Sequence, residues 1–267
     1  MVQVSSVTAM VRALSRAQTI SLVAYQLPYG AILDALKDAA RRGARVGVNL
    51  EARPFPDRGG GIALHNRHVV DDLRRSGVDA RLVDDRGDAP LHAKAARIDG
   101  VLYVDDVNFA NRGTLLRITA NSPSPVWSKG RALAIEAALL ERSRRGDAVE
   151  VETESIGGGN AVYGRLLRLG LAGEHPRLLV SSEAVTGKER TRLVRLAQAG
   201  VEVRTCSADE KFALSGQRAW IGSANATAPY PNPDTVDWGL ATHNRSIVRH
   251  LRAQFESRWE HARVLSA

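Results

Sequence analysis

Hydrophobic and polar positions along the first third of the chain follow a strand and helix alternation. The apolar runs expected for buried strands are residues 19–25, 45–50 and 78–83. The segments with apolar residues at helical spacing are 7–17, 30–42 and 63–76. Gly43 stands just after the second helical segment, where a glycine readily takes the left-handed cap conformation. This order predicts an α/β unit with a mainly parallel sheet flanked by helices.

The same order returns in the second half of the chain. Helices are predicted at 160–171, 187–199 and 244–262, and strands at 177–183 and 201–206. Each half also contains a hairpin, over 93–108 and 211–225, with turns at Asp99-Gly100 and near Ser215-Gly216. We therefore predict two homologous α/β halves, residues 1–150 and 151–267, with Ile156–Asn160 (IGGGN) as the link.

The two hairpin segments align without a gap. The first, His92–Asn108, reads HAKAARIDGVLYVDDVN, and the second, Asp209–Asn225, reads DEKFALSGQRAWIGSAN. Lys94 falls on Lys211 and Asn108 falls on Asn225. The first copy alone has a histidine, and the second alone has Gly-Ser before its asparagine. A repeated basic and polar hairpin is a way to build one anion site from two halves.

The charge of the chain favours a polyanionic partner. The formal net charge is +8 and the pI is about 10.1, which points to nucleic acid first and an acidic membrane surface second. A solvated arginine-rich surface without a polyanionic partner would give the same net charge and pI. Of the 37 basic residues only five are lysines, yet lysine stands at both matched positions of the hairpins. This use of lysine indicates that a compact ammonium group is needed there.

Composition excludes several classes of protein. The 267 residues with 44% hydrophobic positions are enough for one large domain or two small ones, each with a core. No apolar run approaches the 18 residues of a membrane-spanning helix, and the first residues do not read as a signal peptide. The single cysteine, Cys206, excludes an internal disulfide and a cysteine-based zinc site, so we expect a cytoplasmic protein.

A strand–helix–strand unit followed by a His-x-Lys hairpin and a Gly-Ser-x-Asn strand resembles the phospholipase D superfamily. The resemblance runs from TISLVAYQL through His92-Ala93-Lys94 to WIGSANAT and the tail VDWGLATHNRSIVRHLRAQFESRW. In that tail the family shows an acidic residue, a short strand and a helix bearing Phe and Trp. The resemblance implies two halves about a pseudo-two-fold axis that share one active site, with no metal or other cofactor.

The family chemistry is phosphodiester cleavage or transfer. One histidine attacks phosphorus and forms a phosphohistidine, and a second protonates the leaving oxygen. Lysine and amide N–H groups stabilise the negative charge of the transition state. The resemblance implies that His92 is the nucleophile, that Lys94 and Lys211 bind phosphate, that Asn108, Ser223 and Asn225 donate to its oxygens, and that Asp99 and Asp237 are orienting residues.

This chain departs from the family pattern in both hairpins. Asp209 replaces the second histidine, and Asp105-Asp106 replaces the Gly-Ser of the first half. Near Thr119, where an acidic partner for His92 is expected, there is none. The acidic orienting residue of the tail belongs to the half that lost its histidine.

Three accounts of these departures stay open. Asp209 acts as the general acid if its pKa is raised, although two lysines nearby would oppose this. Alternatively, Asp105, Asp106 and Asp209 hold Mg²⁺ or Mn²⁺ for altered chemistry. In the third account hydrolysis is lost and the site binds phosphate only. The plainest alternative is that His92 is a satisfied core histidine.

The sequence favours a phospholipase D-type phosphodiesterase, nuclease-like on DNA or RNA. A catalytically impaired protein that binds phosphate or nucleic acid is the first alternative. A hydrolase or transferase of lipids or small phosphodiesters is the second, because anionic headgroups would also be attracted by the basic charge.

Overall fold

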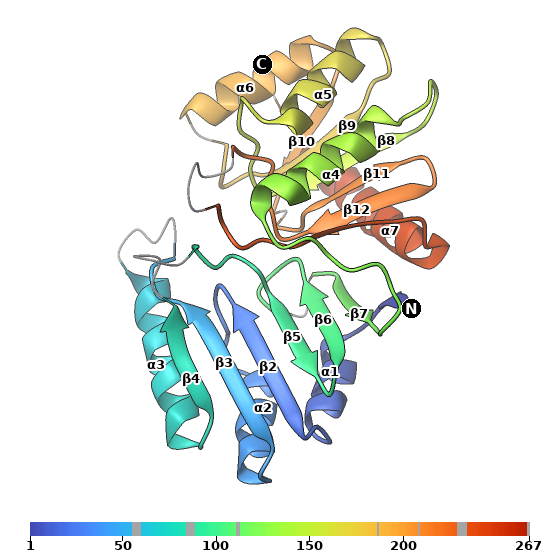
Figure 1. Cartoon of the computed structure of the whole chain (residues 1–267). Coiled ribbons are helices and arrows are strands. Elements are labelled where there is room, and N and C mark those ends of the chain that lie inside the picture. The colour runs from blue at the N-terminus through green and yellow to red at the C-terminus, as the bar shows by residue number, and fades with distance from the viewer. Residues whose placement is uncertain are drawn as a thin grey trace. The chain divides into compact units, whose positions relative to one another are not determined.

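The computed structural model describes residues 1–54, 60–83, 89–110, 113–185, 187–207, 209–228 and 234–265. The chain forms two compact units. Unit 1 consists of residues 1–124 and of a segment that ends at Asp237. Unit 2 consists of residues 125–230 and 238–267. Each unit holds a seven-stranded sheet flanked by helices, so the α/β prediction is confirmed (Figure 1).

Unit 1 begins with a short edge strand and continues as alternating strands and helices. Its helices are α1 (Val7–Leu14), α2 (Ala31–Arg41) and α3 (Gly61–Arg75). Its strands are β1 (Val2–Val4), β2 (Thr19–Ala24), β3 (Arg45–Glu51), β4 (Asp79–Val83), β5 (Ala95–Ile98), β6 (Val101–Asp105) and β7 (Leu115–Ile118). The strand order is β1-β7-β6-β5-β2-β3-β4. Only β2, β3 and β4 pair in parallel, so the sheet is mixed and not mainly parallel as the sequence predicted, because the hairpin strands and the edge strand pair antiparallel.

Unit 2 repeats this arrangement with an additional helix. Its helices are α4 (Lys129–Glu141), α5 (Ala161–Leu171), α6 (Gly187–Gln198) and α7 (Arg245–His261). Its strands are β8 (Val149–Thr153), β9 (Arg177–Ser181), β10 (Glu202–Cys206), β11 (Phe212–Ser215), β12 (Arg218–Gly222), β13 (Gly239–Thr242) and β14 (Arg263–Val264). The order is β13-β12-β11-β8-β9-β10-β14, and β8, β9 and β10 pair in parallel.

The internal repeat covers six strands of each sheet. The order β7-β6-β5-β2-β3-β4 in unit 1 matches β13-β12-β11-β8-β9-β10 in unit 2, and the parallel and antiparallel pairings agree strand by strand. The seventh strand differs, because β1 joins one edge of the first sheet and β14 joins the opposite edge of the second. The shared topology places β5-β6 and β11-β12 as equivalent hairpins.

The units do not divide at residue 150. That position lies inside β8, a central strand of the second sheet, and α4 already belongs to unit 2. The stretch 156–160 is not a linker, because the Asn160 side chain accepts from the N–H of Tyr163 and so caps α5. Helix α4 was not predicted, because its apolar residues lie on several sides of the helix and form no single stripe.

The two sheets differ in how their faces are covered. In unit 1 the helices α1, α2 and α3 pack on one face, with Leu22, Leu36 and Val69 in the core between them. In unit 2 the same kind of core forms under α4 and α5. Helix α7 contributes Arg252 and Arg258 to ion pairs with two carboxylates of β8, Glu150 and Glu152, at 3.3 and 3.0 Å. Both carboxylates are buried.

Among the described residues, no helix combines the length and the apolar character needed to cross a bilayer.

Glu136 of α4 is a buried carboxyl group inside unit 2. Its side chain is almost inaccessible to water, and its Oε2 atom has no hydrogen-bond partner within the described part of the chain. Burial disfavours the charged form and raises the pKa of Glu136 to about 8. The folded chain therefore holds a proton there that the unfolded chain releases at lower pH.

We predict that this proton makes the folded state less stable as pH rises. Between the ordinary pKa of glutamate and about 8, the unfolded state is ionised and the folded state is not, which costs about 1.4 kcal/mol per pH unit. Glu136→Gln should therefore raise the melting temperature at pH 8 more than at pH 5. Glu141→Gln on the exposed end of the same helix is the control. Equal shifts at both pH values would contradict the prediction.

Candidate functional site

The hairpin β5-β6 carries the first set of predicted site residues. Asp99 and Gly100 form its turn with positive φ values of 44° and 83°, as a type I′ turn requires. The carboxylate of Asp99 accepts the N–H groups of Gln18 and Thr19, the latter at 2.8 Å. Asp99 thus fastens the turn to the start of β2, a full strand length away from Lys94. These contacts are structural, and the orienting role of Asp99 stays a prediction of the resemblance.

His92 and Asp237 form a hydrogen-bonded pair in unit 1. Nδ1 of His92 lies 2.7 Å from Oδ1 of Asp237, whose side chain is 2% exposed. The hydroxyl of Thr235 donates to the other carboxylate oxygen of Asp237 at 2.8 Å. A carboxylate held in this way keeps the Nδ1 proton on the ring, which leaves the lone pair of the neutral imidazole on Nε2.

A short parallel pairing brings Asp237 to His92. Leu91 pairs with Val236, the N–H of His92 donates to the carbonyl of Val236 at 3.0 Å, and the N–H of Val236 donates to Pro90 at 2.8 Å. The tail segment that ends at Asp237 therefore belongs to unit 1. The prediction that Asp237 belongs to the half without a histidine is wrong, because Asp237 belongs to unit 1.

Lys94 and Tyr25 complete the surroundings of the imidazole. Nζ of Lys94 lies 3.2 Å from Nε2 of His92, and the lysine is only 2% exposed. The same ammonium lies 5.5 Å from the ring centroid of Tyr25, a cation–π distance. The Tyr25 ring packs edge-on against His92, with centroids 5.1 Å apart. The imidazole is thus contacted by the Lys94 ammonium at Nε2 and by the Tyr25 ring.

Two buried polar residues of β3 and α3 support this arrangement and were not foreseen. Oε2 of Glu51 accepts the N–H of Leu91 at 2.6 Å, directly before His92. The amide of Asn66 donates to the carbonyl oxygens of Tyr25 and Glu51 at 2.8 and 2.9 Å. The ends of β2 and β3 are thereby tied to the segment that carries His92. A glutamate at the end of an otherwise apolar strand was the available signal in the sequence.

Asp105 and Asp106 serve the loop that follows β6. Asp105 accepts the N–H of Phe109 at 2.6 Å, and Asp106 accepts the N–H of Thr114 at 2.8 Å. Both carboxylates are buried. Across the described ranges, no group of three His, Cys, Asp or Glu side chains is arranged to hold a metal ion. The loop that these two aspartates shape contains Asn108, which is half-buried.

In unit 2 a glutamate joins the predicted phosphate ligands. Lys211 is 3% exposed, and its Nζ lies 3.2 Å from Oε2 of Glu154, which follows β8. The Asn225 amide donates to the same oxygen at 3.1 Å. Lys211 also donates to the backbone carbonyl of Asp209. Ser223 is fully buried, and its hydroxyl accepts the N–H of Trp238 at 3.0 Å.

The matched asparagines share one feature. In both Asn108 and Asn225 the side-chain oxygen is buried and accepts no hydrogen bond from the residues that the structure describes. Buried polar atoms are nearly always paired, and leaving one unpaired costs about 1–3 kcal/mol. The repeat has this feature in both units. The unpaired atom is an acceptor in each, so it does not bear on the donation to phosphate that the resemblance implies for these amides.

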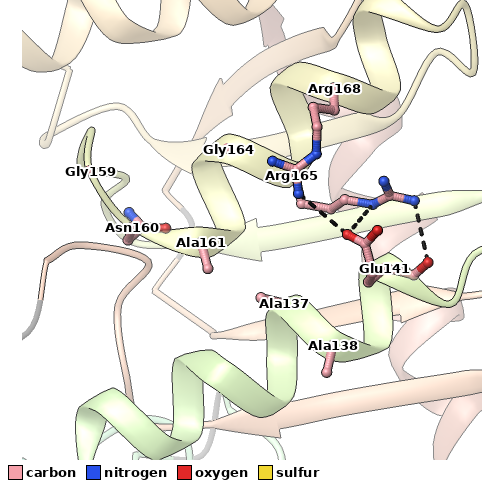
Figure 2. A pocket seen from close by; sticks show the side chains of 9 residues that line it. All are labelled: Ala137, Ala138, Glu141, Gly159, Asn160, Ala161, Gly164, Arg165 and Arg168. Atoms are coloured by element: carbon pink, nitrogen blue, oxygen red, sulfur yellow. Dashed lines mark hydrogen bonds and ion pairs between the residues drawn. The ribbon is translucent and has the colours of Figure 1, made fainter.

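A cavity of about 510 Å³ lies elsewhere in unit 2, between α4 and α5 (Figure 2). Its charged groups bind one another: Arg165 and Arg168 lie 3.4 and 3.3 Å from the carboxylate of Glu141. None of the predicted site residues lines it. The candidate residues therefore lie at the hairpin of each unit, taken separately, and not at this cavity.

Comparison with known proteins identifies the fold. No protein-family model matches the sequence, and no curated protein matches it. The structure resembles phosphatidylserine synthase from Haemophilus influenzae, with a TM-score of 0.69 and 10% identity over 98% of this chain and 87% of that one. It also resembles polyphosphate kinase from Porphyromonas gingivalis, with a TM-score of 0.62 and 16% identity over 96% of this chain. The chain spans about half the length of that kinase, 50%.

Both proteins belong to the phospholipase D superfamily. The chain has a phospholipase D-like fold. At these identities the likeness shows the fold alone. The phospholipase D-like fold accounts for the repeat of six strands and for the equivalent hairpins of the two units.

We predict that Glu51→Ala loosens the segment that carries His92. The buried carboxylate accepts the Leu91 N–H, and a charge-assisted hydrogen bond of this kind is worth about 1.5–3 kcal/mol. Amide hydrogen exchange at Leu91 should therefore quicken by about tenfold or more. Asn49→Ala is the control on the same strand, because Asn49 instead accepts from Arg81. Unchanged exchange in a folded Glu51→Ala protein would show that the contact does not hold this segment.

Proposed function

We propose that this protein is a phosphodiesterase of the phospholipase D type that uses His92 as its nucleophile. One observation carries the proposal: Nδ1 of His92 is bound to the buried carboxylate of Asp237, while Nε2 faces the ammonium of Lys94 at 3.2 Å. A core histidine without a function needs neither a buried carboxylate nor a buried lysine. The arrangement supplies a directed lone pair and a positive charge at one point.

The proposed reaction has two displacements at phosphorus. In the first, the Nε2 lone pair of His92 forms a bond to phosphorus, the ester P–O bond breaks, and the leaving oxygen takes a proton. In the second, water attacks the phosphohistidine and gives a proton to the Asp209 carboxylate left by the first displacement, the P–N bond breaks, and the electron pair returns to Nε2. Asp237 holds the ring and stabilises its positive charge in the intermediate. Asp209 stays the proposed proton donor, because it stands where the family has its second histidine.

Phosphate binding is assigned to one lysine in each hairpin and to the polar residues near the strand ends. Lys94 and Lys211 supply positive charge, and Asn108, Ser223 and Asn225 supply hydrogen bonds, as the resemblance implies. The burial of both lysines supports this assignment, because a desolvated ammonium attracts an anion more strongly than an exposed one. That these residues act on one phosphate stays a prediction of the repeat.

Nucleic acid is the proposed substrate. The formal charge of +8 favours a polyanion, and DNA or RNA presents a phosphodiester at every residue. A lipid or small phosphodiester is the second candidate, and the likeness to a phosphatidylserine synthase supports it. A binding protein that has lost hydrolysis is the third, and the replacement of the second histidine by Asp209 supports it.

We predict that His92→Ala abolishes cleavage and that Asp237→Asn lowers the rate by about 10²-fold. An asparagine no longer provides the negative charge that holds the ring, and loss of such a partner of a histidine costs 10-fold to 100-fold or more. The assay follows cleavage of a labelled single-stranded oligonucleotide and of an aryl phosphodiester in EDTA. His68→Ala on the exposed side of α3 is the matched control and should keep full activity.

Retained cleavage in His92→Ala would rule out the phosphohistidine mechanism. If the wild type cleaves neither substrate, a binding protein without hydrolytic activity is favoured. Vesicles that contain anionic lipid are then the next substrate to assay.

We predict that nucleic acid binding depends on both matched lysines and falls steeply with salt. Lys94→Ala and Lys211→Ala should each weaken the binding of an oligonucleotide and lower the slope of log K against log salt by about 0.7–0.9. Lys188→Ala, at an exposed position of α6, is the control for a simple loss of charge. Fluorescence anisotropy from about 50 to 200 mM salt measures the affinity for the oligonucleotide and the slope of log K against log salt. A flat salt dependence of the wild type would contradict a polyanionic partner.

A further inference from the structure

The sheet registers give residues of unit 1 their counterparts in unit 2. Ala95 pairs with Val23 of β2, and Phe212 pairs with Glu152 of β8. Ala95 and Phe212 are the residues that follow the two matched lysines of the hairpins. Val23 and Glu152 are therefore equivalent positions in the repeat, and so are the residues that follow them on each strand.

Two residues beyond these positions, the units differ in a way that matters for an anion. Unit 1 has Tyr25 and unit 2 has Glu154. The Tyr25 ring lies over the ammonium of Lys94, with Nζ 5.5 Å from the centroid. The Glu154 carboxylate lies 3.2 Å from the ammonium of Lys211. The repeat thus supplies an aromatic face to one lysine and a negative charge to the other.

Glu154 occupies the position of an anion in unit 2. Its Oε2 atom contacts both Nζ of Lys211 and Nδ2 of Asn225, at 3.2 and 3.1 Å. The proposed function assigns three residues of unit 2 to phosphate: Lys211, Asn225 and Ser223. Glu154 contacts the first two of them. A carboxylate oxygen between an ammonium and an amide N–H makes the same contacts that a phosphate oxygen would make.

We propose that Glu154 is a specificity-determining residue of the phosphate-binding pair formed by the side chains of Lys211 and Asn225. A phosphate oxygen binds this pair only when it displaces the carboxylate. Small anions such as inorganic phosphate are thereby disfavoured, and ligands that are held by additional contacts are selected. The inference rests on the proposed function, because it takes Lys211 and Asn225 as phosphate ligands.

The burial of the partners makes this exchange physically reasonable. Lys211 is almost completely buried, and a buried ammonium is costly without a nearby negative charge. The Glu154 side chain is 47% exposed, so its carboxylate regains water when it leaves the lysine. Exposed ion pairs are weak for the same reason. Glu154 therefore neutralises Lys211 in the free protein and yields to an anion that is held more firmly.

The test measures the affinity of inorganic phosphate by isothermal titration calorimetry. Glu154→Gln should bind phosphate about tenfold more tightly than the wild type, because a like charge beside a bound anion is removed. The gain should disappear when Lys211→Met is added. Glu202→Gln is the matched control, since it removes one carboxylate from an exposed position of β10 in the same unit. It should leave the phosphate affinity unchanged.

A second variant keeps the inference falsifiable if Glu154→Gln folds poorly. Glu154→Tyr installs the residue of unit 1 at the equivalent position and should also tighten phosphate binding. Unchanged or weaker phosphate affinity in a folded variant would overturn the inference. So would an equal gain in Glu202→Gln, or a gain that persists without Lys211.

The outcome is separable from that of the proposed function because phosphate binding needs no turnover. Tighter binding in Glu154→Gln without any phosphodiesterase activity of the wild type would reject the reaction and keep the inference. Full activity with unchanged phosphate affinity would reject the inference alone.

Discussion

The candidate site depends on one short parallel pairing, between the segment that carries His92 and the tail segment that ends at Asp237. The two residues of the pair are 145 positions apart in the chain. Two backbone hydrogen bonds and one carboxylate fix the imidazole ring, and directly after Asp237 the chain returns to unit 2 with Trp238. If the pairing were lost, Nδ1 would lose its partner and Nε2 would lose its direction. The orientation of the His92 imidazole therefore depends on tertiary structure and not on the His-x-Lys motif alone.

The repeat preserves the backbone while the chemistry of the two units has separated. Six strands keep their order and pairing, and a lysine stays buried at the same place in each hairpin. Around these lysines almost every polar partner differs. In unit 1, Lys94 meets an imidazole and an aromatic ring, and in unit 2, Lys211 meets a carboxylate and a backbone carbonyl. A buried ammonium needs a compensating group, and this group differs between the two units. Of the two lysines, only Lys94 contacts a histidine among the residues that the structure describes.

Local patterns in the sequence were enough for most of the fold. Helices with a clear apolar stripe and strands with apolar runs between glycines were predicted within a few residues, because their burial is one-sided or complete. Helix α4 was missed since its apolar residues do not form a single stripe, and β8 was missed although its alternation Val149, Glu150, Val151, Glu152 has the period of a strand. Its glutamates are buried because arginines of α7 pair with them. Ion pairs between distant elements leave no local pattern.

The same limit explains what the sequence predicted of the site. The matched lysines and asparagines follow from an ungapped alignment, which needs no knowledge of contacts. The partner of His92 cannot be found from this alignment. Alignment by halves assigns Asp237 to unit 2, whereas in the structure Asp237 belongs to unit 1. Glu154 was also invisible, since its role appears only when β8 is paired with β11 and its register is compared with that of β2 and β5. Divergence within a repeat is therefore best detected from strand register. The register shows which residue has replaced which beside a conserved charge, even where the two strands share no recognisable sequence.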